Sequence, residues 1–98
     1  MAHQLATLLA HRRAGIPPTR REIVSAVADE VMGSWDSWDS IEATAREGLA
    51  DADRQAIEDT LRQHALAEDL DDLDDLADEI EEHIVATCSR QVAEEETR

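Results

Sequence analysis

The feature that most constrains the fold is a row of aliphatic residues in the last third of the chain, spaced three or four positions apart. At about 100° per residue this row forms one helical stripe, and the acids of the same segment fall on the opposite side. The pattern predicts a long amphipathic helix that begins near residue 69 and continues past residue 90, with residues 94–98 as a frayed tail. The row consists of Leu70, Leu73, Leu76, Ala77, Ile80, Ile84 and Cys88.

Shorter helices are expected before it. Residues 2–13 carry leucines at helical spacing, and Gly15 follows them as a stop. Thr19 and Glu22 fit the capping box, which predicts the start of a second helix that ends at Gly33. Together with the two helices described next, they are expected to be too short to cover the whole aliphatic row, so that part of it packs on another chain.

Two further helices are predicted from cap residues. Ser34, Ser37, Asp39 and Ser40 are all suitable N-caps for a third helix, and Asp39 is preferred because, with Glu42, it forms an acidic version of the capping box. Asp51 or Asp53 is a suitable cap for a fourth helix. The apolar stripe of that fourth helix is expected to contain Ile57, Leu61, His64 and Ala65.

Composition agrees with helices and argues against strands. Only three Gly and two Pro supply turns, and aromatic residues make up 2% of the chain. A length of 98 residues allows one hydrophobic core. We therefore predict an all-α protein: a single acidic domain over residues 1–98, built as a compact bundle of four to five short helices with a longer amphipathic C-terminal helix.

The two tryptophans are the only aromatic residues, and they stand in the heptapeptide SWDSWDS. Trp38 lies one turn before Ile41 on the face that Ile41 shares with Ala45, so we expect Trp38 to be buried. Trp35 is expected to be more exposed and is a candidate for partner binding, because tryptophan is a favoured interface anchor.

The chain is strongly acidic, with 24 Asp and Glu, nine Arg, no Lys and a net charge of −15. This excess fits an acidic face for a basic partner, but adaptation to a high-salt host or a GC-rich genome explains it more simply. Residues 1–21 contain four arginines and no acid, whereas residues 22–98 have a net charge of −19. The four are Arg12, Arg13, Arg20 and Arg21.

Two roles suit these arginines. The simpler one is to balance the acidic helices of the same molecule. The other is a head-to-tail contact in which they meet Asp75, Asp78 and Glu82 of a second copy, giving a homo-oligomer.

Motifs for catalysis, metals or cofactors are not found. The segment DLDDLDDLADE contains no Gly for a calcium loop, and His83 and Cys88 are five positions apart, so they point in different directions on a helix. Cys88 is expected to be a buried, inert thiol. No phosphate loop or nucleophile elbow occurs. We predict a protein that is not an enzyme and holds no cofactor and no metal.

The sequence thus favours a small acidic protein that works by contact, as a subunit of a larger assembly or as an inhibitor. Alternatives are a nucleic-acid mimic of the phage anti-defence type and an antitoxin or immunity protein that covers a basic toxin site. The expected partner is a protein with a basic surface, with no direct nucleic acid and no membrane. The expected location is the cytoplasm, or a virion for a phage subunit. The candidate partner-binding residues are Trp35, Arg12, Arg13, Arg20, Arg21, Asp71, Asp75, Asp78 and Glu82.

Overall fold

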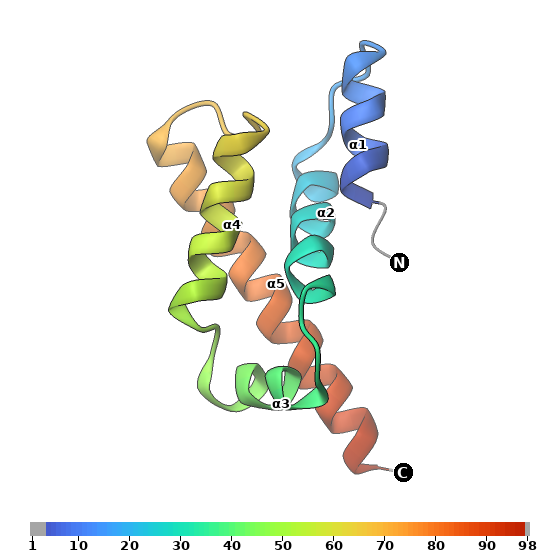
Figure 1. The fold of residues 1–98 in the computed structure, drawn as a ribbon, viewed down its shortest axis with the longest axis vertical. Coiled ribbons are helices and arrows are strands. Elements are labelled where there is room, and N and C mark those ends of the chain that lie inside the picture. The colour runs from blue at the N-terminus through green and yellow to red at the C-terminus, as the bar shows by residue number, and fades with distance from the viewer. Residues whose placement is uncertain (1–3, 98) are drawn as a thin grey trace.

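The computed structural model describes residues 4–97, and all its regular structure is helical (Figure 1). The predicted all-α bundle with a long last helix is confirmed. The five helices are α1 (Gln4–Arg13), α2 (Arg20–Gly33), α3 (Trp38–Glu47), α4 (Asp51–Gln63) and α5 (Leu70–Glu96).

The longest helix, α5, organises the bundle. Its 27 residues extend roughly 40 Å and account for most of the 45 Å length of the molecule. Helices α2, α3 and α4 all pack on α5, whereas α1 packs on α2 (Figure 1). Residues 94–96, which we expected in a frayed tail, belong to this helix, and Arg98 lies outside the described residues.

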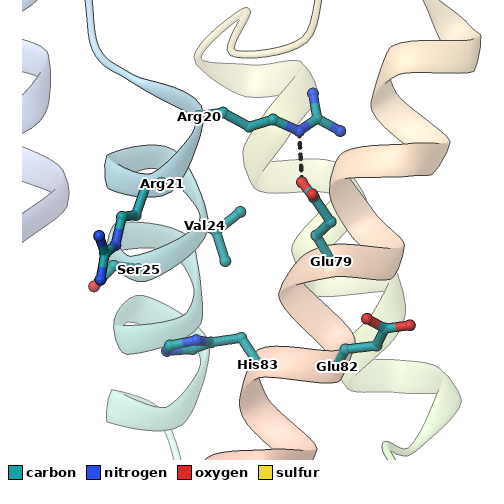
Figure 2. A pocket seen from close by; sticks show the side chains of 7 residues that line it. All are labelled: Arg20, Arg21, Val24, Ser25, Glu79, Glu82 and His83. Carbon is teal, nitrogen blue, oxygen red and sulfur yellow. Dashed lines mark hydrogen bonds and ion pairs between the residues drawn. The ribbon is translucent and has the colours of Figure 1, made fainter.

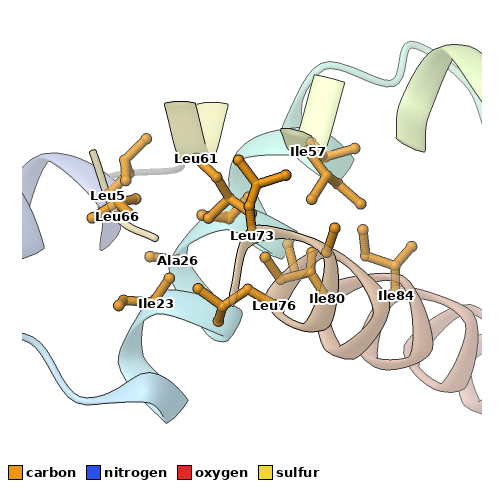
Figure 3. Close-up of a cluster of buried hydrophobic side chains, with 14 of the residues drawn as sticks. Leu5, Ile23, Ala26, Ile57, Leu61, Leu66, Leu73, Leu76, Ile80 and Ile84 are labelled. Carbon is orange, nitrogen blue, oxygen red and sulfur yellow. The ribbon is translucent and has the colours of Figure 1, made fainter. Parts of the chain in front are cut away.

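The predicted aliphatic row of α5 forms the centre of the core (Figure 3). Ile80, Ile84 and Cys88 are completely buried, and Leu73 is 7% exposed, so the shorter helices cover the row from residue 73 to residue 88. The expectation that part of the row packs on another chain is therefore wrong for residues 73–88 and stays a prediction for Leu70. Only Leu70, the first residue of α5, is strongly exposed, at 78%. Side chains in a helix lean toward its N-terminus, so a first residue projects past the end of its own helix.

Local sequence explains most helix ends. The capping box of Thr19 and Glu22 is formed at the start of α2, and Asp69 caps α5 by accepting the backbone N–H of Asp72 at 2.8 Å. The preferred cap of α3, Asp39, is wrong, and Ser37, another of the candidates, takes its place; both predicted caps of α4 are wrong. The N-cap of α3 is Ser37 and that of α4 is Ala50, neither with a side-chain bond.

Helix α4 also ends earlier than its predicted stripe. The N–H of Leu66 donates to the Leu61 carbonyl at 2.9 Å, and the N–H of Ala65 donates to the Arg62 carbonyl at 3.2 Å. Ala65 has a φ of 48°, which completes a Schellman C-cap. His64 and Ala65 therefore lie beyond the helix, and Leu66 takes their place in the core at 8% exposure.

Candidate interaction surface on the last helix

On the side of α5 that faces α4, one arginine gathers four carboxylates. The Arg54 guanidinium lies 2.7 Å from Glu81, 2.8 Å from Asp78, 3.0 Å from Glu58 and 3.2 Å from Asp74. Its side chain is only 22% exposed, so these pairs are partly shielded from water. The hydrogen bonds to Asp78 and Glu81 raise the pKa of Arg54 above its ordinary value. Arg54 thus joins α4 to α5 and reduces the repulsion among the carboxylates of this flank.

On the side of α5 that faces α2, Arg20 has the corresponding role. Its guanidinium lies 2.6 Å from Glu79 and 3.0 Å from Asp72. Asp72 also accepts the backbone N–H of Glu68 at 3.0 Å, and this bond, followed by the one from Arg20, lowers the pKa of Asp72. The simpler role predicted for the arginines, balancing the acidic helices of the same molecule, is confirmed for Arg20.

Between these two flanks lies a row of acids that we call the ridge, defined as Asp71, Asp75 and Glu82. All three are exposed. Helical geometry places them within about 40° of one another and directly opposite the buried row of α5. In the part of the chain that the structure describes, their side chains make no ion pair and no hydrogen bond. The ridge therefore presents carboxylates that the fold does not use.

A shallow groove of about 810 Å³ runs between α2 and α5. Figure 2 shows the Arg20–Glu79 pair bridging this groove, with Arg21 on the α2 side and Glu82 on the α5 side. Three of the predicted partner-binding residues, Arg20, Arg21 and Glu82, line this groove, but the side chains of Arg21 and Glu82 point in opposite directions (Figure 2). It is lined by Arg20, Arg21, Val24, Ser25, Glu79, Glu82 and His83.

The other predicted site residues are placed apart from one another. Arg12, at the end of α1, donates to the backbone carbonyl of His64 at the end of α4. Asp78 belongs to the Arg54 flank and is not on the ridge. Among the described residues, neither Arg13 nor Arg21 makes an ion pair, and both are exposed.

The two tryptophans have the opposite environments from those expected. Trp35 packs against the core, and its indole N–H donates to Asp53 at 3.2 Å. Trp38 is 40% exposed at the first position of α3. The prediction of a buried Trp38 and a more exposed Trp35 is therefore wrong.

The physical reason for this reversal is Thr44. Its hydroxyl donates to the Ser40 carbonyl at 2.8 Å, so this polar residue can be buried, at 4% exposure. Including Thr44 rotates the core-facing side of α3 and leaves Trp38 about 70° from its centre. When only the hydrophobic residues of α3 define the core-facing side, Trp38 lies about 20° from its centre.

Sequence reasoning missed Arg54 as a structural centre. The sequence does contain a hint, since Glu58 lies four positions after Arg54, which is the spacing of a helical ion pair. However, the carboxylates that Arg54 contacts on α5 lie 20 or more positions away. Their meeting depends on the packing of α4 on α5.

Neither a metal site nor a reactive thiol is evident in the structure. Across residues 4–97, no group of three His, Cys, Asp or Glu side chains has the arrangement needed to hold a metal ion. Cys88 is fully buried, and burial raises the pKa of its thiol. In the same range, no helix combines the length and the apolar character that a membrane span requires.

Comparison with known proteins gives no family. The chain matches no family model, no curated protein and no solved structure.

Proposed function

We propose that this protein acts by contact rather than by catalysis, and that the ridge of α5 binds a partner protein with a basic surface. The supporting observation is the contrast within one helix. Two arginines pair with the carboxylates on the flanks of α5, whereas Asp71, Asp75 and Glu82 remain exposed without a counter-ion. Three uncompensated acids on one face repel each other, and a basic partner removes that repulsion.

The charge of the whole molecule supports the same class of partner. A net charge of −15 attracts a basic protein over several ångströms and speeds their encounter. The same charge repels nucleic acid, and it also repels a second copy of the chain. A homo-oligomer is further disfavoured because the aliphatic row of α5, part of which we expect to pack on another chain, is buried in the monomer except for Leu70.

Three biological roles are compatible with binding a basic partner protein. A subunit of an assembly, an inhibitor that mimics nucleic acid and an antitoxin that covers a toxin site all use an acidic surface against a basic one. All three roles share the contact between an acidic and a basic surface, and that contact is what we propose.

A defined basic probe tests the proposal. A fluorescein-labelled peptide of about 20 residues, rich in Arg and Lys, is titrated with the protein by fluorescence anisotropy. The ridge variant combines Asp71→Asn, Asp75→Asn and Glu82→Gln. We expect it to bind about tenfold more weakly at low salt, because each exposed pair contributes up to about 1 kcal/mol.

The matched control combines Asp29→Asn, Glu30→Gln and Asp51→Asn, which changes the net charge by the same amount at positions away from the ridge. We expect this control to weaken binding by less than about threefold. An equal loss in both variants would show that only the overall charge matters and would contradict a ridge-specific site.

A further inference from the structure

Trp38 is the one aromatic side chain of this chain that the fold leaves exposed. It stands at the first position of α3 with 40% of its surface exposed, whereas Trp35 packs against the core and is bonded to Asp53. Folding thus explains Trp35 but leaves a large part of the Trp38 indole in water. An indole exposed in this way has the character of an interface anchor.

The surroundings of Trp38 indicate the chemistry of what covers it. Asp36 and Asp39 lie on either side of it in the sequence, both are exposed, and neither takes part in an ion pair within residues 4–97. Residues 34–53 as a whole carry six acids and one base, Arg46, which is paired with Glu42 at 3.4 Å. Within this stretch the one base is therefore already engaged, and Asp36 and Asp39 have no ion pair among the described residues.

An arginine or lysine side chain matches both properties. Its aliphatic stem packs on an aromatic face, its cationic head is attracted to the ring, and the same head pairs with a neighbouring carboxylate. A neutral apolar segment would cover the indole but would leave both carboxylates without a partner. Charge complementarity therefore selects a basic occupant.

We infer that Trp38, together with Asp36 and Asp39, forms an anchor for an arginine- or lysine-bearing segment of a partner protein. This inference rests on the proposed function, since it assumes a basic partner, and it adds a second contact on α3 to the ridge on α5. The anchor and the ridge have no residue in common, so variants of each test the two contacts separately.

The experiment uses the full-length chain and the same basic peptide of about 20 residues. Trp38→Ala removes the anchor, and Trp38→Phe keeps an aromatic face. Leu70→Ala is the matched control, because Leu70 is also an exposed apolar residue at the first position of a helix. A second peptide, in which neutral citrulline and norleucine replace the Arg and Lys, keeps the size of the side chains but not their charge.

We expect Trp38→Ala to weaken binding of the basic peptide about tenfold, which corresponds to the loss of one good anchor. Trp38→Phe should recover at least half of that loss on a logarithmic scale, and Leu70→Ala should stay within about twofold of the parent protein. In a Trp35→Phe background, where Trp38 is the only emitter, the peptide should also shift the indole emission.

The peptide experiment distinguishes a wrong Trp38 anchor from a wrong proposed function. If the parent protein binds the basic peptide and Trp38→Ala binds it equally well, the anchor is wrong and the ridge proposal stands. Equal binding of the neutral peptide would overturn the basic chemistry of the anchor. If the parent protein does not bind the basic peptide at all, the proposed function itself fails.

Discussion

On the flanks of α5 the carboxylates contact arginines from neighbouring helices, whereas on its ridge the same kinds of side chain have no counter-ion. Asp74 and Asp78 lie within 3.2 Å of Arg54, yet Asp71 and Asp75, on the same helix, have no partner among the described residues. The two groups do not differ in residue type. They differ in their angle around the helix relative to the buried row.

This difference shows that an acidic segment has no single role. Acids beside the core-facing stripe come within reach of α2 and α4, and there they stabilise packing. Acids opposite the stripe stay out of reach of any neighbouring helix. Position around the helix therefore separates the carboxylates that maintain the fold from those that are available to a partner.

The largest effect is expected from removing Arg54. Arg54→Ala leaves Asp74, Asp78 and Glu81 close together without a cation, at a site where the arginine is only 22% exposed, while Glu58 keeps Arg62 at 3.4 Å. We expect the free energy of unfolding to fall by about 2 kcal/mol, measured by urea denaturation. Arg54→Lys should recover part of this loss, because lysine keeps the charge but cannot bond to several carboxylates in one plane. A stability for Arg54→Ala equal to that of the parent protein would mean that the α4 flank is not held by this arginine.

A smaller effect is expected on the α2 flank. Arg20 pairs with two carboxylates instead of four, and its side chain is 46% exposed, so water screens these pairs more strongly. Arg20→Ala should lower the urea midpoint by clearly less than Arg54→Ala does. If the order were reversed, the flank facing α2 would be the more important one for the fold.

Acid should act on the α2 flank through Asp72. The pKa of this carboxyl is lowered in the folded state by the Glu68 N–H and by Arg20. Its charge therefore contributes stability above the ordinary Asp pKa of about 3.9, and this contribution is lost as the pH falls through the lower folded value. The difference in unfolding free energy between the parent protein and Asp72→Asn should thus be constant above about pH 5 and shrink below about pH 4. A difference that grows on acidification would contradict the assignment.

The architecture was predictable from local patterns. The spacing of aliphatic residues in α5 and the Thr19–Glu22 capping box act within one or two turns, so the sequence alone reveals them. The Arg54 centre was not predictable, because it joins segments separated by more than 20 positions. The two tryptophans were assigned the wrong way round because a buried threonine does not appear in a hydrophobic pattern.

The candidate site was predictable only in part. The acids of the ridge were selected from their position opposite the aliphatic row, and the structure places Asp71, Asp75 and Glu82 on an exposed face. Asp78 was selected by the same argument, but it is bonded to Arg54 at 2.8 Å. An angular difference of about 20° from the ridge is enough to bring it within reach of α4.

The most direct test of the division between flank and ridge compares two matched triple variants of α5 by urea denaturation. The flank variant combines Asp74→Asn, Asp78→Asn and Glu81→Gln, and the ridge variant combines Asp71→Asn, Asp75→Asn and Glu82→Gln. Both change the net charge of the same helix by the same amount with the same substitutions. We predict that the flank variant loses about 1–2 kcal/mol of unfolding free energy, while the ridge variant is unchanged or gains a few tenths. Equal losses in the two variants, or a larger loss in the ridge variant, would contradict this account.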